Sequence, residues 1–66
     1  MEMIRVNSSA IRTVGYDPVT GRMKIVFAQG HVYDFCRVPS HVFEGLLRAS
    51  SKGAYYNAHI RDRYPC

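Results

Sequence analysis

The stretch HVYDFCRVPSHVFEGLL, residues 31–47, decides the fold, because the spacing of its apolar residues changes partway along. Before Pro39, residues 31–36 place successive side chains on opposite faces with a period of two, which is typical of a β-strand. After Pro39 the spacing becomes helical, and the apolar stripe consists of Val42, Phe43, Leu46 and Leu47. Pro39 itself suits the first turn of a helix. The stretch therefore predicts a strand followed directly by a helix that ends near Ala49.

Two further strands are expected upstream of this change of period. Residues 22–28 alternate apolar and polar side chains, so one of their faces should be buried. The segment DPVTG at 17–21 is typical of a turn, and the Gln-Gly pair at 29–30 is typical of a tight two-residue hairpin. In the β-rich segment 10–16 the apolar residues are out of phase, which predicts a bulge at Gly15.

The predicted architecture is α+β: a three-stranded antiparallel β-meander followed by two short C-terminal helices packed on one face. Residues 2–7 are interpreted as a short, exposed entry strand outside that count. The second helix is expected over residues 53–61, with Ser51 as its N-cap. The core is predicted to consist of Phe27, Phe43, Leu46 and Ile60.

Length and composition indicate a single domain over residues 1–66, because 66 residues of which 47% are apolar suffice for one thin core. The opening residues lack the continuous apolar run of a signal peptide, and no segment is long enough and apolar enough to span a membrane. We therefore expect a cytoplasmic protein that binds no membrane. In that compartment Cys36 and Cys66 are expected to be free thiols.

The positive charge is concentrated in the second half of the chain. Residues 37–66 carry five Lys or Arg against two Asp or Glu, whereas residues 1–36 carry four against three, and the formal net charge is +4. A basic surface favours polyanionic partners such as nucleic acid. The alternative is that the charge only keeps a small domain soluble.

Four segments together resemble the KTSC domain family over about residues 7–65. They are SSAI at 8–11 with GYD at 15–17; Gly30 with VYDF at 32–35; VP at 38–39 with Val42 and Leu46; and SKG at 51–53 with YYN at 55–57, Ile60 and Arg61. Each segment is short, and the specificity of the match lies in their order and spacing.

The resemblance implies a small domain that occurs at the C-termini of some lysyl-tRNA synthetases and alone in small bacterial and phage proteins. For this family RNA binding has been suggested, and no function is established. The central Tyr-x-Tyr of the family is Tyr33-Asp34-Phe35 here, so a role that needs the second hydroxyl is in doubt. An aminoacylation role does not follow, because the chain carries no synthetase catalytic domain.

The loop at 51–53 is the strongest candidate for contact with a phosphate. A glycine-containing loop that opens a helix presents free backbone N–H groups to an anion, and Lys52 adds a positive charge. The alternative is purely structural, with Ser51 capping the helix and Gly53 easing the turn. Of the adjacent Tyr55 and Tyr56, we expect Tyr56 to point inward and Tyr55 outward, beside the cations, where its ring could stack on a base. The predicted nucleic-acid surface comprises Arg48, Ser51, Lys52, Gly53, Tyr55, Arg61 and Arg63.

Catalysis and metal binding are not expected. The His and Cys residues show no pair with metal-ligand spacing, and no activated nucleophile or paired carboxylates are visible. No cofactor is expected either. The leading hypothesis is a binding module for RNA or single-stranded nucleic acid. The alternatives are a protein-interaction module, such as a phage-type factor that docks on a host protein, and a weak homodimer in place of a monomer.

Overall fold

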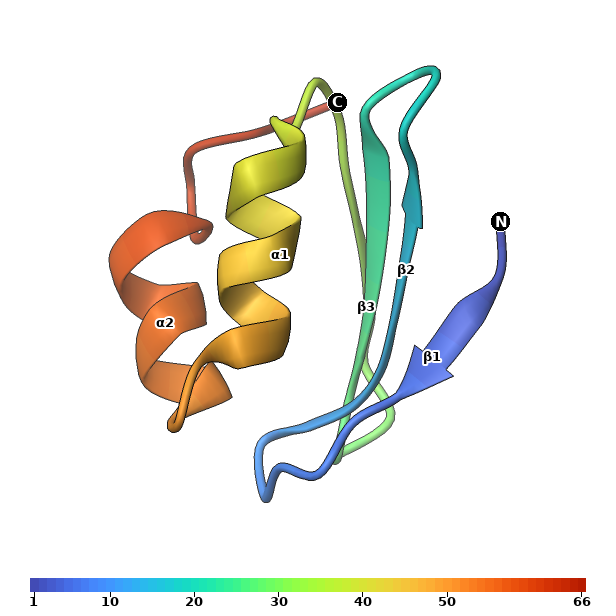
Figure 1. Ribbon diagram of the computed structural model, residues 1–66. Coiled ribbons are helices and arrows are strands. Elements are labelled where there is room, and N and C mark those ends of the chain that lie inside the picture. Colours follow the sequence, from blue (N-terminus) through green and yellow to red (C-terminus); the bar gives the residue numbers. More distant parts are fainter.

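The computed structural model describes all 66 residues, and it contains four antiparallel strands covered by two helices. The strands are β1 (Met3–Arg5), β2 (Ile11–Asp17), β3 (Arg22–Phe27) and β4 (Val32–Phe35), and the helices are α1 (Ser40–Arg48) and α2 (Lys52–His59). Strand order in the sheet follows chain order, and both helices lie on one face (Figure 1). The α+β class and the two C-terminal helices are therefore confirmed. Neither helix is long and apolar enough to cross a membrane.

The predicted count of three strands is wrong, because the entry segment joins the sheet as β1. Its three residues are all exposed, so β1 carries no alternation of buried and exposed positions that a sequence pattern could reveal. β1 pairs with β2 with Met3 opposite Gly15. A side chain at Gly15 would overlap those of Met1 and Met3, so this glycine lets them lie across β2. The bulge predicted at Gly15 lies instead between Ile11 and Thr13.

The turns follow the local chemistry of their residues. The Asp17 carboxylate accepts a hydrogen bond of 3.0 Å from the backbone N–H of Val19, and this bond lowers the pKa of Asp17. Gly21 and Gly30 have φ angles of 78° and 100°, which glycine adopts without strain. The loop between β3 and β4 holds four residues, 28–31, rather than the predicted two, and the N–H of Phe27 donates a hydrogen bond to the carbonyl oxygen of His31 across it.

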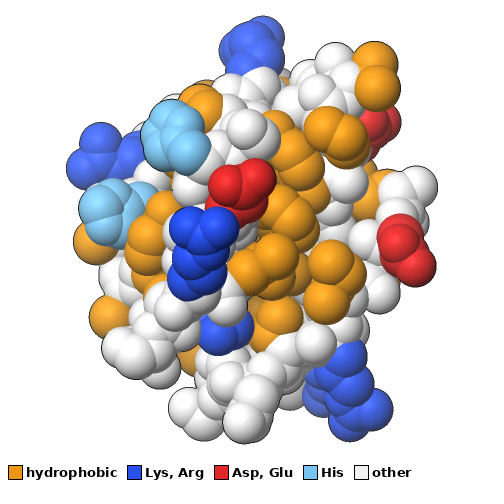
Figure 2. Space-filling model, viewed as in Figure 1, with side chains coloured by type: hydrophobic (Ala, Val, Ile, Leu, Met, Phe, Trp, Pro, Cys, Tyr) orange, Lys and Arg blue, Asp and Glu red, His pale blue; other side chains and the backbone are white.

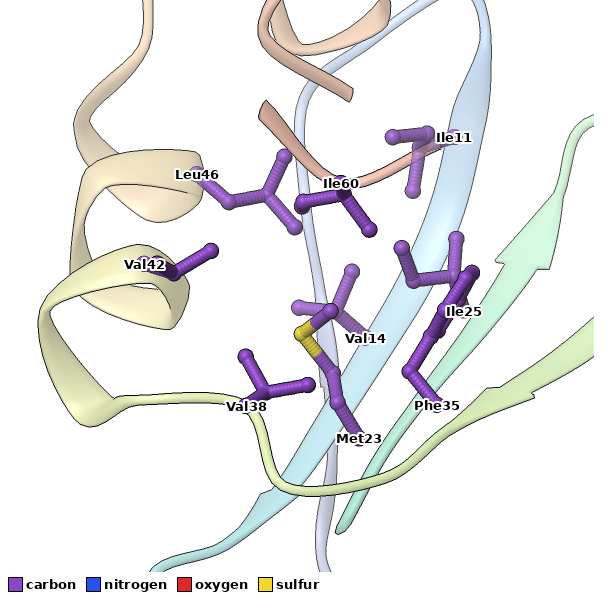
Figure 3. Close-up of a cluster of buried hydrophobic side chains, with 9 residues drawn as sticks. All are labelled: Ile11, Val14, Met23, Ile25, Phe35, Val38, Val42, Leu46 and Ile60. Atoms are coloured by element: carbon purple, nitrogen blue, oxygen red, sulfur yellow. The ribbon is translucent and has the colours of Figure 1, made fainter. Parts of the chain in front are cut away.

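The core is a cluster of nine buried side chains between the sheet and the helices (Figure 3). Its members are Ile11, Val14, Met23, Ile25, Phe35, Val38, Val42, Leu46 and Ile60. The predictions of Leu46 and Ile60 as core residues are confirmed, since neither has exposed surface. Phe27 and Phe43 were predicted wrongly: both are half-buried and pack against the margin of the core. Branched aliphatic side chains make up most of the thin centre, with Met23 and Phe35, and the other large rings lie around it.

The two helices meet where Gly45 of α1 faces Tyr55 of α2. The Tyr55 hydroxyl donates a hydrogen bond of 3.1 Å to the carbonyl oxygen of Val42. A Cβ at position 45 would overlap that hydroxyl and the ring carbons beside it. Tyr55 is therefore half-buried between the helices, and its predicted outward orientation is wrong.

Replacement of Gly45 by alanine tests this contact. In the wild-type background we expect the free energy of unfolding to fall by about 1–3 kcal/mol, because the new methyl group displaces Tyr55. In a Tyr55→Ala background the same change should raise it by about 1 kcal/mol, the ordinary helix preference for alanine over glycine. Urea unfolding of the four proteins measures both values. A change in the free energy of unfolding with the same sign in both backgrounds would show that Tyr55 does not restrict the side chain at position 45.

The prediction of free thiols is also wrong, because Cys36 and Cys66 form a disulfide. The two residues are 30 positions apart in sequence, yet their Cα atoms are 4.8 Å apart. The physical reason is that the chain passes through both helices and then returns to the end of β4. The number of cysteines in the sequence does not indicate that the chain returns to β4. The cytoplasmic location stays a prediction.

Candidate functional site

An open cleft with a volume of about 870 Å³ lies between the edge strand β4 and the C-terminal end of the chain. Aromatic side chains dominate its walls, and they come from strands, helix and tail. They are Phe27, His31, Tyr33, Phe35, Tyr56 and Tyr64. We call this hollow the aromatic cleft, and we call residues 61–66 the tail.

Hydrogen bonds to main-chain carbonyl oxygens connect two walls of the aromatic cleft to neighbouring segments. On one side the N–H of Ala28 donates to the carbonyl oxygen of Ala10 at 2.9 Å, and the Arg12 guanidinium donates to the carbonyl oxygen of Ala28 at 3.0 Å. On the other side the N–H of Cys36 donates to the carbonyl oxygen of Tyr64 at 3.1 Å. The β3–β4 loop and the tail are thereby fixed on opposite sides of the opening.

The rings inside the cleft pack edge to face. Phe27 lies at the centre, with its centroid 5.0 Å from that of Tyr56 and 5.5 Å from that of Tyr33, at interplanar angles of 74° and 75°. These are favourable aromatic geometries, and they fix the orientations of the outer rings. Tyr33 keeps 50% of its surface exposed. The cleft therefore offers an exposed aromatic surface that is already oriented.

Charges at the mouth of the cleft are mixed. Arg61 lies 3.9 Å from Asp62, and Asp34 lies 3.9 Å from Lys24 on the outer face of the sheet. All four side chains are well exposed, so these ion pairs contribute little to stability and leave Arg61 available to a ligand. Burial raises the pKa of Tyr56 above its ordinary value of 10.0, and the charge of Arg61 opposes part of this rise. The Tyr56 phenol is therefore neutral at physiological pH.

A second, smaller hollow of about 280 Å³ contains the predicted loop at 51–53. The Ser51 hydroxyl accepts a hydrogen bond from the N–H of Ala54, which confirms its role as N-cap of α2. The Lys52 ammonium donates to the carbonyl oxygen of Ala49 at 3.0 Å and so bonds the C-terminus of α1. Ser9 and Ala10 line both hollows, so the two are contiguous.

The predicted site residues do not come together in one place. Ser51, Lys52 and Gly53 line the small hollow, Arg61 lines the aromatic cleft, and Tyr55 is held between the helices. Arg48 and Arg63 are exposed and line neither hollow. The prediction missed all six aromatic residues of the cleft, although one signal was present. Residues 31, 33 and 35 share a strand face, and all three line the cleft.

The distribution of charge does not by itself define a site. Figure 2 shows one face of the molecule, where hydrophobic side chains gather over the centre and Lys and Arg side chains stand apart from one another around it. No group of three or more His, Cys, Asp or Glu side chains is placed to hold a metal ion. The aromatic cleft is thus the main concave feature with a distinctive chemistry.

Comparison with known proteins gives relatives that match nearly the whole chain. A protein of Tsukamurella paurometabola is 39% identical over 59 residues, covering 89% of this chain and 88% of that protein. A protein of Stutzerimonas stutzeri is 35% identical over 64 residues, covering 97% and 90%. The crystal structure of a KTSC domain protein from Yersinia pestis superposes with a TM-score of 0.91 at 28% identity, covering 96% of this chain and 89% of that one.

Longer proteins also contain this domain. A lysine–tRNA ligase of Nostoc punctiforme is 32% identical over 62 residues, which are 94% of this chain and 11% of the ligase. The family model for the KTSC domain matches residues 7–64. The chain therefore belongs to the KTSC domain family.

Proposed function

We propose that this protein is a binding module for single-stranded nucleic acid, with RNA preferred, and that the aromatic cleft receives the bases. The observation that carries the proposal is the exposed ring of Tyr33, held in position by Phe27 within an aromatic wall that has Arg61 beside it. Proteins that bind single strands combine aromatic rings, on which bases stack, with cations along the path of the backbone.

The contiguity of the two hollows supports a path for the strand. If the bases lie in the aromatic cleft, the adjoining nucleic-acid backbone would pass Ser9 and Ala10 and reach the loop that contains Lys52. A phosphate there would meet the amino-terminal end of α2 and the Lys52 ammonium. The presence of a related domain within lysine–tRNA ligases, enzymes whose name denotes tRNA as substrate, agrees with an RNA partner.

Fluorescence anisotropy with a labelled oligouridylate of about ten nucleotides tests the proposal. We expect the Tyr33→Ala variant to bind about 5–150-fold more weakly, because loss of one stacking ring removes about 1–3 kcal/mol. Tyr33→Phe keeps the ring and should bind like the wild type. With Lys52, Arg61 and Arg63 each neutralising one phosphate, the logarithm of the binding constant should fall with the logarithm of salt at a slope of about −2.

A matched pair of arginine variants separates the site from general attraction to a basic protein. Arg61→Ala should reduce the salt slope by about 0.7, the value for one phosphate contact. Arg22→Ala removes the same charge at the other end of β3 from Phe27 and should leave the slope unchanged. Equal effects of both variants would mean that the overall positive charge of the protein attracts the probe and that the aromatic cleft does not bind it. Absence of binding at low salt and micromolar protein would reject the nucleic-acid proposal.

One observation favours a protein partner as the second candidate. The main-chain groups at the outer edge of β4 are open between the β3–β4 loop and Cys36. Because the N–H of Cys36 turns outward to Tyr64, the alternation of an antiparallel strand turns the main-chain groups of Val32 and Asp34 outward as well. An extended peptide could pair with this edge and place side chains in the aromatic cleft.

A further inference from the structure

The tail supplies a large part of the aromatic cleft. Of the fourteen residues that line it, Arg61, Asp62, Tyr64 and Pro65 belong to the tail. They include the one cation of the cleft and one of its rings. The position of the tail therefore decides whether the cleft has two walls or one.

The tail is held by backbone hydrogen bonds, by the packing of Tyr64 against the core and by the disulfide. The N–H of Arg63 bonds the carbonyl oxygen of Ile60, and the carbonyl oxygen of Tyr64 accepts from Cys36. Tyr64 is half-buried, whereas Arg63 and Pro65 are exposed. One hydrogen bond between the tail and β4 contributes only about 0.5–1.5 kcal/mol. The bond from Cys66 to Cys36 adds a covalent attachment of the tail to the end of β4 beside these weaker contacts.

The disulfide is also open to chemical attack. Cys66 is exposed, while Cys36 is half-buried. A thiolate can therefore approach the sulfur of Cys66 and displace the thiolate of Cys36. The second thiol of a dithiol reductant then completes the exchange. In total the protein disulfide takes up two electrons and two protons and becomes two thiols, and the reductant becomes a disulfide.

We propose that the Cys36–Cys66 disulfide is a redox latch for the aromatic cleft. When the disulfide is formed, the tail is fixed against β4 and the cleft is complete. When a dithiol reduces it, residues 62–66 leave β4, Tyr64 loses its fixed position, and the cleft loses part of one wall. The consequence for ligand binding rests on the proposed function, whereas the release of the tail does not.

Backbone NMR relaxation of the oxidised and the reduced protein tests the release directly. On reduction with dithiothreitol we expect the order parameters of residues 62–66 to fall from about 0.85 to below about 0.6, the values of rigid and flexible backbone. The signals of β2 and β3 should keep their positions. A Cys36→Ser/Cys66→Ser variant should have the flexible tail in either condition and should not respond to dithiothreitol. An unchanged tail in the reduced protein would overturn the latch, and so would unfolding of the whole sheet.

Binding of the labelled oligouridylate to the same samples tests the functional consequence. We expect the reduced protein and the double-serine variant to bind at least about tenfold more weakly than the oxidised protein, because the ring of Tyr64 is no longer held in the cleft. Equal or tighter binding after reduction would show that the tail does not contribute to the site. If neither form binds the probe while the tail is released, the proposed function fails and the latch itself stands.

Discussion

Replacement of Leu46 by alanine is expected to lower the free energy of unfolding by about 2–5 kcal/mol. Leu46 points from α1 into the core, between Val42 on the same helix and Ile60 after α2, and it has no exposed surface (Figure 3). Truncation removes buried methyl groups and leaves a cavity that neighbouring elements can only partly fill. A domain of this size has little stability in reserve, so the urea midpoint should fall strongly.

Leu47→Ala is the matched control, because it makes the same chemical change at the next position. Leu47 is only half-buried, so less apolar surface is lost and solvent can fill the space. We expect a distinctly smaller decrease, measured in the same urea titration. Equal decreases for the two variants would mean that the face of α1 assigned to the core is wrong.

Loss of the Cys36–Cys66 disulfide is expected to lower the free energy of unfolding by about 3–4 kcal/mol. The bond closes a loop across a sequence separation of 30 residues that includes both helices. In the chain-entropy account, opening a loop of this length gives the unfolded chain about that much additional freedom. Urea unfolding of the oxidised wild type and of the Cys36→Ser/Cys66→Ser variant measures the difference.

Two observations should accompany this decrease. The slope of the unfolding free energy with urea should be steeper for the double variant, because its unfolded chain is more expanded and exposes more surface. Dithiothreitol should shift the midpoint of the wild type and leave that of the variant unchanged. Coincident midpoints of wild type and variant would show that the loop closure adds nothing to stability.

The sequence predicts best the elements whose signals are local. The apolar stripe after Pro39 gives α1, the hydroxyl of Ser51 gives the start of α2, and Asp17 with Gly21 gives the first β-turn. In each case the deciding interaction joins residues that are close together in the chain, so their spacing is visible in the sequence.

The features that the sequence did not predict depend on contacts between distant residues. β1 has no buried face, and its place in the sheet follows only from pairing with β2. The disulfide depends on the return of the chain from α2 to β4. The burial of Tyr55 depends on the absence of a side chain at Gly45, ten positions earlier and on the other helix. None of these leaves a periodic pattern.

The candidate site was predicted only in part, because it too depends on contacts between residues that are distant in the sequence. The loop at 51–53 carries a local motif and does border a hollow. The aromatic cleft instead collects side chains from β3, β4, α2 and the tail. Each aromatic residue alone is compatible with an ordinary core position. Only the assembled fold shows which of the rings that line the cleft stay exposed, such as Tyr33, and which are also part of the buried core, such as Phe35.

The agreement of strand order with chain order has a kinetic consequence. Each strand pairs with the strand that precedes it, so the sheet can form through successive hairpins that close only short loops. The helices also form from local contacts. Proteins rich in contacts between nearby residues fold faster than those that must first join distant segments. We therefore expect this chain to reach its native topology rapidly and without a long-lived state that exposes unpaired strand edges.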